Sequence, residues 1–304
     1  MTALKASLIQ ERNASPGDSV SAAWRATHGH WDPFEAAAFH VVAKRTLGRL
    51  LAALDEIGVP ALIVKGALLA HTVYADPVER PMCDLDLKVR PSDLARVARF
   101  FRTTRGARIV RDSRVGSNVV AHFGGMEVDV ESRLGPPLIC ALGVGDLLAR
   151  ARRTSDALGF EHWRIDVNDH ALLLAIDLFK DHVGAKPWAS GDLRRIALSP
   201  SFDATVLAAR AREARCTTIV HVAARKIAEE ARDPRWARVA STLAPARPAY
   251  ARRMLATLAG TRRIPRPLQV LEARGASDSR ARSLGSIALS AWWRWTEFGP
   301  AFAE

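Results

Sequence analysis

Three aspartates in the sequence are spaced like the ligands of a metal centre. Asp84 and Asp86 are separated by one leucine, and Asp129 lies in residues 127–131, where acidic residues alternate with valine. Because residues i and i+2 of a β-strand point to the same face, each segment would present its carboxylates together. Neighbouring carboxylates repel each other unless a cation lies between them, and Mg²⁺ or Mn²⁺ takes oxygen ligands of this kind. Asp84, Asp86 and Asp129 therefore predict a metal site that could support phosphoryl transfer.

Each acidic segment also has an ordinary structural explanation. Residues 84–88 could form an edge strand with polar side chains in solvent, and residues 127–131 could form a half-exposed acidic strand. The chain has 44 Lys and Arg against 32 Asp and Glu, a formal net charge of +12, so an acidic strand is an unusual choice here. This balance favours the metal site over the solvent-facing strand.

The aspartates need two strands that hold them side by side. Residues 118–131 have the pattern of a β-hairpin, with Gly124-Gly125 between two β-branched runs. Both turn positions can then adopt positive φ, as a tight hairpin turn requires. If the second strand of this hairpin lies beside the strand of Asp84 and Asp86, Asp129 completes the cluster.

A glycine turn precedes the first acidic segment. Residues 61–64 are typical of a short strand and residues 67–74 of a helix, so Gly66 lies where the strand leads into the helix. The free N–H groups of a helix N-terminus favour an anion. We interpret Lys65, Gly66 and Ala67 as phosphate-binding residues. An ordinary turn is the alternative, because the Walker A spacing is absent.

The pattern along the chain predicts an α/β (α+β) fold. A partly irregular segment, 1–33, precedes a mixed-sheet catalytic domain, 34–167, and an all-helical domain, 168–304, that forms the far wall of a cleft. The predicted elements are a helix at 34–57, a helix after 91–93 that ends near 106, a strand at 107–113, a helix at 147–154, a strand at 160–167, a helix at 168–183 capped by Asn168-Asp169, and a loop at 262–278.

The composition of the chain bears on its cellular compartment and on its possible binding partners. The three cysteines have no metal-site or pairing pattern, which favours a reducing, cytoplasmic setting. No apolar run is long enough to predict a membrane span, and residues 1–32 lack the apolar core of a signal peptide. The positive charge suggests a nucleic-acid partner, but the arginines are scattered rather than clustered with aromatic residues.

Trp292, Trp293 and Trp295 form an aromatic cluster near the end of the chain. We expect them to pack the last helix against the rest of the molecule. A membrane-surface or partner anchor is the alternative.

The segments 64–70, 74–77 and 80–87, which read VKGALLA, YADP and RPMCDLDL, resemble the polymerase-beta-type nucleotidyltransferase superfamily. The closer resemblance is to a poorly characterised bacterial branch of it. The likeness covers about Leu51 to Arg133 and continues more weakly from Asn168 to Leu198.

This resemblance implies a metal-dependent transfer of a nucleoside monophosphate from a nucleoside triphosphate, with ATP as the expected donor. Asp84 and Asp86 would bridge the metal ions, and Asp129 would bind the catalytic metal and help to deprotonate the acceptor. The helical half would lie across the cleft. Lys180, His182 and Lys186 are candidates there for contact with the triphosphate or the acceptor.

The sequence departs from the branch at several positions. Ala67 stands where Ser is usual, Lys88 where an apolar residue is usual and Glu131 where His is common. The spacing from Gly66 to Asp84 is longer than in the polymerases. None of these differences removes a predicted metal ligand.

The acceptor is open among small molecules, peptides, proteins and RNA. Members of the branch occur beside gene clusters for ribosomal peptides, including lasso peptides, which suggests peptide tailoring, and modification of a toxin protein is a third alternative. A non-catalytic RNA- or peptide-binding protein on the same fold is the alternative from another class. Retention of all three aspartates argues against it.

Overall fold

A seven-stranded mixed sheet forms the N-terminal part of the molecule. The computed structural model describes residues 33–80, 82–113, 117–179, 187–262 and 265–298. The strand order is β3-β4-β5-β2-β1-β7-β6, in which β2 and β5 are parallel and β1 and β2 antiparallel. The strands are β1 (Leu62–Ile63), β2 (Asp84–Lys88), β3 (Arg108–Ser113), β4 (Asn118–Phe123), β5 (Met126–Glu131), β6 (Arg152–Thr154) and β7 (His162–Arg164).

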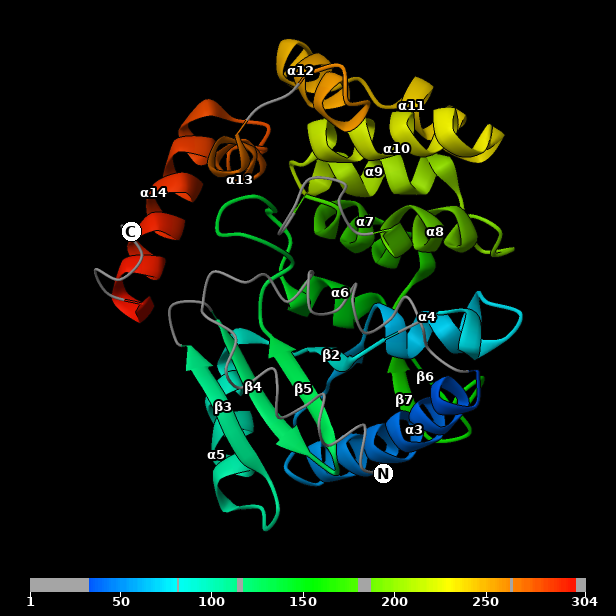
Figure 1. Cartoon of the computed structure of the whole chain (residues 1–304), viewed down its shortest axis with the longest axis vertical. Coiled ribbons are helices and arrows are strands. Elements are labelled where there is room, and N and C mark those ends of the chain that lie inside the picture. The colour runs from blue at the N-terminus through cyan, green and yellow to red at the C-terminus, as the bar shows by residue number, and fades with distance from the viewer. Residues whose placement is uncertain (1–32, 81, 114–116, 180–186, 263–264, 299–304) are drawn as a thin grey trace.

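Helices pack on the sheet, and after β7 the described residues up to Phe298 form helices and no further strand, as the sequence predicts for the fold class. Figure 1 shows the sheet in the lower half of the view and α7 to α12 stacked above it. The predicted boundary at 167 falls at the start of α7, and whether it separates two domains stays a prediction. The helices are α3 (Pro33–Glu56), α4 (Gly66–Thr72), α5 (Leu94–Thr103), α6 (Val144–Arg150), α7 (Val167–Asp177), α8 (Pro187–Ile196), α9 (Ala204–Glu213), α10 (Thr217–Ala231), α11 (Pro234–Thr242), α12 (Pro248–Leu258), α13 (Arg266–Arg274) and α14 (Arg280–Phe298), with short 3-10 turns η2 (Pro77–Glu79) and η3 (Pro91–Asp93).

The apolar face of the central strands belongs to the core. Leu85 and Leu87 of β2 and Val128 and Val130 of β5 are fully buried. They join one continuous core with residues of α3 and α5, and each such side chain contributes about 2 kcal/mol through burial. Because strand side chains alternate, the acidic residues of the same strands must lie on the opposite face.

The predicted hairpin is present. β4 and β5 pair antiparallel around Gly124 and Gly125, whose φ angles are 58° and 87°. The Thr46 hydroxyl on α3 donates to the Gly124 carbonyl at 3.1 Å. A Cβ at Gly124 would come within 2.9 Å of that hydroxyl oxygen, so this turn needs glycine for its conformation and for contact with α3.

The outermost strand at one end of the sheet, β3, is irregular. Its pairing with β4 shifts between Ile109 and Arg111, which marks a β-bulge. The strand at the other end of the sheet, β6, has Arg152 and Arg153 exposed.

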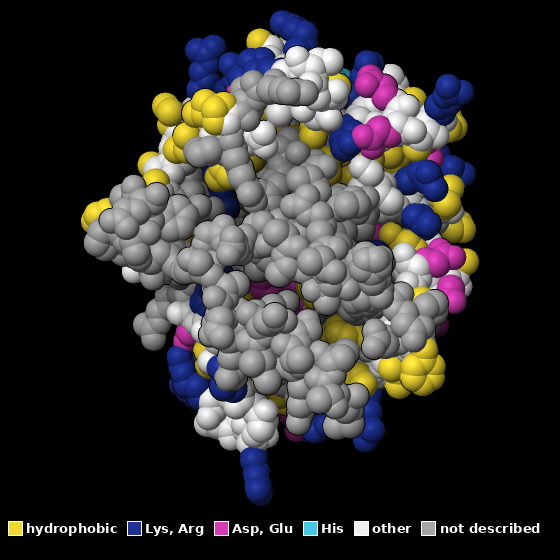
Figure 2. Space-filling model, in the orientation of Figure 1, with side chains coloured by type: hydrophobic (Ala, Val, Ile, Leu, Met, Phe, Trp, Pro, Cys, Tyr) yellow, Lys and Arg dark blue, Asp and Glu magenta, His cyan; other side chains and the backbone are white. Residues whose placement is uncertain are grey.

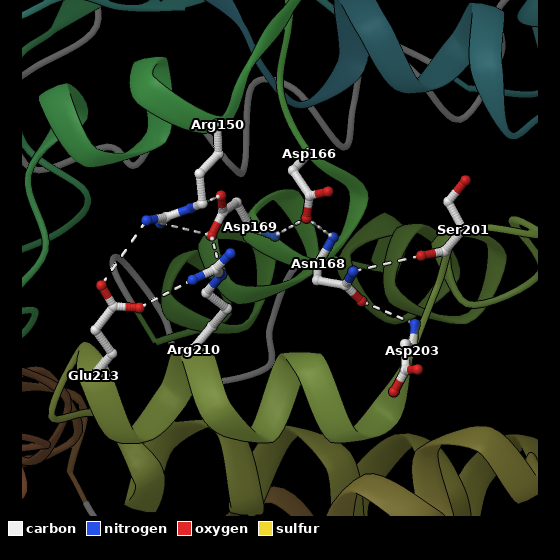
Figure 3. Close-up of polar contacts among 8 residues, drawn as sticks. All are labelled: Arg150, Asp166, Asn168, Asp169, Ser201, Asp203, Arg210 and Glu213. Carbon is white, nitrogen blue, oxygen red and sulfur yellow. Dashed lines mark hydrogen bonds and ion pairs between the residues drawn. The ribbon is translucent and has the colours of Figure 1, made fainter.

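A buried charge cluster joins α6, α7 and α9 (Figure 3). Asp169 is fully buried, and its two carboxylate oxygens accept hydrogen bonds from Arg150 at 2.7 and 2.9 Å. Arg210 lies 3.5 Å from the same carboxylate and 3.1 Å from Glu213. We call Asp169, Arg150 and Arg210 the junction cluster, because it ties the start of the helical part to the end of the sheet part.

Asparagine and aspartate side chains complete this junction. Asp166 accepts from the backbone N–H groups of Asn168 and Asp169, and Asn168 accepts from the N–H of Asp203 at 2.9 Å. Asp166 is therefore the N-cap of α7, and the predicted Asn168-Asp169 cap is wrong by two to three residues.

Three other element predictions need correction. The predicted loop at 262–278 contains α13, in which Pro267 lies in the first turn, a position where proline does not break a helix. The predicted helix at 147–154 is α6, which starts earlier at Val144 and is followed by the strand β6. The predicted strand at 160–167 is shortened to β7. The helix predicted at 168–183 corresponds to α7 up to Asp177, and its last residues lie outside the described part.

The tryptophan prediction holds for one residue of three. The Trp293 indole N–H donates to the Ser113 hydroxyl at 3.0 Å, which fixes α14 beside the end of β3. Trp292 and Trp295 are 54% and 61% exposed. Among the described residues, no helix is long and apolar enough to cross a membrane.

Candidate active site

The predicted acidic strands are neighbours. β2 and β5 pair in parallel with Asp84 opposite Glu127 and Asp86 opposite Asp129. Paired residues on adjacent strands point to the same face of a sheet, so the carboxylates share the face that is opposite the core. We call Asp84, Asp86, Glu127, Asp129 and Glu131 the acid face. In Figure 2 acidic side chains are visible at the centre of the molecule, with Lys and Arg mostly around the margins.

The three aspartates do not form a finished metal cage. Within the described ranges, no three acidic, histidine or cysteine side chains are grouped as metal ligands would be. Two of the aspartates are hydrogen-bonded to other side chains: Asp86 accepts from the Lys65 ammonium at 2.8 Å and Asp129 from the Asn118 amide at 3.2 Å. Metal coordination by Asp84, Asp86 and Asp129 therefore stays a prediction.

Asp84 is buried among other acidic side chains, which makes its carboxyl group harder to ionise. Burial raises the pKa of its carboxyl group from 3.8 to about 7, and Asp86, Asp129 and Glu127 add to the rise while Lys65 opposes it. A carboxyl group that resists ionisation because it is buried and lies near other carboxylates is more easily ionised when a cation binds beside it. Oxygen ligands with excess negative charge fit a hard divalent ion such as Mg²⁺.

Lys65 lies between two carboxylates from different parts of the chain. Its Nζ atom is 2.8 Å from Asp86 Oδ1 and 3.4 Å from Oδ1 of Asp177, the last residue of α7. Burial acts to lower the pKa of Lys65, but the charges of Asp177, Asp86 and Glu131 raise it well above its usual value. The side chain is therefore a permanent cation at the edge of the acid face.

The backbone of Lys65 is strained. Its φ is 56° and its ψ is −136°, a conformation that favours glycine and costs about 1–3 kcal/mol in other residues. Its N–H donates to His170 Nε2 at 3.1 Å and its carbonyl accepts from the N–H of Leu69 at 2.8 Å. Burial and the charge of Lys65 lower the pKa of His170 to about 3, so its Nε2 is unprotonated and can accept this bond.

The glycine turn is where the sequence predicts it. Gly66 is the first residue of α4, no side chain caps this end of the helix, and Ala67 is buried. A Cβ at Gly66 would come within 3.1 Å of the Met82 Cβ, so close packing already requires a small residue here. Phosphate binding by Lys65, Gly66 and Ala67 stays a prediction. Lys180, His182 and Lys186 lie outside the described residues, and their predicted role is likewise untested.

Three residues that contact the site were not among the predicted site residues. Asp177 contacts Lys65, His170 holds the Lys65 backbone, and Asn118 holds Asp129. Asn118 had a usable signal, because the hairpin pattern places it on the strand beside Asp129.

The residues of the YADP and RP segments have mainly structural contacts. Asp76 accepts from the N–H of Val78 and caps η2, with Pro77 in the first turn. Arg80 forms a buried two-bond ion pair with Asp192 of α8, both bonds 2.8 Å, and the Tyr74 hydroxyl donates to the same carboxylate at 2.6 Å. These contacts fasten α8 to the loop that leads into β2.

Two of the residues at which the sequence departs from the branch pattern contact each other. Lys88 and Glu131 are paired across β2 and β5, and their side chains form a salt bridge. Lys88 also donates to the Arg133 carbonyl at 2.7 Å. A buried lysine is tolerated at this position because the Glu131 carboxylate lies opposite it and balances its charge.

The mixed sheet, with carboxylates paired across two adjacent strands and helices following it, agrees with the fold that the resemblance implies. The chain belongs to a family described as uncharacterised nucleotidyltransferase, whose sequence model matches residues 4–230. The matched range includes the whole acid face, Lys65 and Asp177, and ends one residue before the end of α10. No curated protein matches the chain.

Proposed function

We propose that the protein is a metal-dependent nucleotidyltransferase that moves a nucleoside monophosphate from a nucleoside triphosphate to an acceptor hydroxyl or phosphate. Family membership supports nucleotidyl transfer in general. The observation that carries the metal-dependent reaction is the register of β2 and β5, which brings Asp86 opposite Asp129 on the face that also carries Asp84.

The donor set favours Mg²⁺ or Mn²⁺ held by Asp84, Asp86 and Asp129. When bound, the ions would supply positive charge at the attacking and leaving oxygens. The raised pKa of Asp84 supports this assignment, because its causes, after burial, include the negative charges of Asp86, Asp129 and Glu127.

The chain's own residues would orient the reactants. Lys65 and the N–H groups of Gly66 and Ala67 would hold phosphate oxygens, with ATP as the expected donor. The acceptor oxygen would form a bond to the α-phosphorus while the bond to the bridging oxygen breaks and pyrophosphate leaves. Asp129, kept in place by Asn118, would accept the acceptor proton.

The proposed acceptor is a small molecule, a peptide or a protein. A peptide acceptor would agree with the natural-product tailoring role that the resemblance suggests. The reaction with the donor triphosphate is the same for all three classes of acceptor, so it is tested first.

The test is to incubate the purified protein with Mg²⁺ and each α-labelled triphosphate and to measure pyrophosphate release and self-labelling. We expect release with at least one triphosphate, and its loss in Asp86→Asn with the fold retained. Asp156→Asn is the matched control, because Asp156 is exposed and lies 4.0 Å from its partner Arg164. Nucleotide binding without turnover in the wild type would instead support the non-catalytic alternative.

A further inference from the structure

The ammonium of Lys65 already occupies a position beside the acid face that a bound metal cation would approach. Its ammonium contacts Asp86, one of the proposed metal ligands, at 2.8 Å. A divalent cation bound to the same carboxylate would stand close to this ammonium, and like charges at such distances repel by several kcal/mol even at an effective dielectric constant of about 20. The ammonium and the metal therefore compete for Asp86.

A second carboxylate is already placed for the ammonium. Asp177 Oδ1 is 3.4 Å from Lys65 Nζ, on the side of the helical part. All three side chains are mostly buried, with exposed fractions of 13% for Lys65, 12% for Asp86 and 15% for Asp177. A small movement of Nζ would exchange the nearer partner for the farther one.

The side chain can move while the backbone stays fixed. The N–H of Lys65 is held by His170 and its carbonyl by the N–H of Leu69. The lysine stem is flexible, and its ammonium has three donors in contrast to the planar fork of arginine. The movement is therefore confined to the end of the side chain.

We propose that Lys65 is the resident counter-ion of the acid face and that its ammonium passes from Asp86 to Asp177 when a divalent cation binds. This inference rests on the proposed metal-dependent function. It assigns Asp177 as a positioning residue that acts through Lys65. It also makes the phosphate contact conditional, because the donor released from Asp86 becomes available to the triphosphate only after the metal has bound.

If Asp177 acted on the metal directly and not through Lys65, its removal would have a different effect on metal binding. If Asp177 were itself a metal ligand, or only a nearby negative charge, its removal would weaken metal binding equally with or without Lys65. If it acts by receiving Lys65, its removal matters only while Lys65 is present. A double-mutant cycle separates the two cases.

The experiment measures Mn²⁺ binding without nucleotide, by electron paramagnetic resonance of the free ion, in four proteins: wild type, Lys65→Met, Asp177→Asn and the double variant. We expect Lys65→Met to bind Mn²⁺ roughly tenfold more tightly, because the competing cation is gone. Asp177→Asn should bind roughly fivefold more weakly, and the same change in the Lys65→Met protein should alter the affinity less than about twofold.

Lys65→Gly provides a second variant that also lacks the ammonium. It suits the positive φ at this position, so it should fold even if Lys65→Met does not. Unchanged or weaker Mn²⁺ binding in a folded Lys65 variant would overturn the inference and leave the proposed function standing, as would equal effects of Asp177→Asn in both backgrounds. Absence of Mn²⁺ binding in all the proteins would overturn both.

Discussion

The junction cluster and the acid face are both built from partly or fully buried carboxylates, but they balance charge in opposite ways. At the junction one aspartate, Asp169, meets two arginines, and bidentate geometry satisfies both of its oxygens. On the acid face several carboxylates meet few cations, and the pKa of Asp84 rises to about 7, mainly through burial and then through Asp86. The comparison separates a carboxylate whose charge is matched within the fold from a group of carboxylates that outnumber the cations beside them.

The largest expected effect is the loss of stability when the junction cluster is disrupted. Asp169→Asn would leave Arg150 and Arg210 without their buried partner, and removal of one member of a buried ion pair typically costs about 3–5 kcal/mol. We expect a loss of that size in the free energy of unfolding, measured by urea denaturation. A loss below 1 kcal/mol would mean that solvent reaches the arginines and that the cluster is not structural.

The second largest expected effect is the loss of stability when the contacts that hold α8 are removed. Asp192→Asn would weaken the pair with Arg80 and the bond from Tyr74, at an expected cost of about 2–3 kcal/mol. The same urea titration measures it. Tyr74→Phe, which removes only one hydrogen bond, should cost about 1 kcal/mol, and an equal loss in both variants would contradict the assignment to the ion pair.

Removal of a carboxylate from the acid face should increase the free energy of unfolding, in contrast to the two substitutions above. Because the pKa of Asp84 is raised from 3.8 to about 7 in the folded protein, the folded state keeps a proton that the unfolded chain releases. The stability contributed by this difference is complete below about pH 4 and is lost as the pH rises to about 7.

Asp84→Asn removes that loss, so at pH 8 without divalent ions the variant should be more stable than the wild type by about 1–2 kcal/mol, after allowance for solvent screening. Unfolding measured at pH 4 and pH 8 gives the two values. A variant less stable than the wild type at pH 8 would show that Asp84 is a structural carboxylate like Asp169.

The smallest effect sets the baseline for the comparison. Arg225 and Glu229 form an exposed pair one turn apart on α10, with a distance of 2.6 Å. Glu229→Gln should change the unfolding free energy by less than about 0.5 kcal/mol, because solvent screens such pairs. A larger change would require every stability value above to be reinterpreted, since surface charge alone would then account for part of it.

The sequence was most informative where short-range patterns decide the structure. Alternation placed Asp84 and Asp86 on one face of a strand, and Gly124-Gly125 predicted the hairpin that carries Asp129. The adjacency of β2 and β5 was an added assumption, and the observed register confirms it.

Long-range contacts could not be read from local patterns. Nothing near Asp177 in sequence indicates that the end of α7 meets Lys65. The cysteines are similar: their spacing shows no pair, yet the thiols of Cys140 and Cys216 are hydrogen-bonded, and this bond lowers the pKa of Cys140. The loop prediction at 262–278 failed because proline and glycine at helix ends give the same composition as a loop.

The bulge in β3 and the arginines of β6 bear on how the protein behaves at high concentration. An outermost strand offers unpaired backbone groups to any other strand, and natural sheets resist such association with bulges and charged side chains. Arg108 and Arg111 are exposed on β3, as are Arg152 and Arg153 on β6. Part of the net charge of +12, which on composition alone suggests a nucleic-acid partner, therefore lies on both outer strands of the sheet, where it opposes association with other strands.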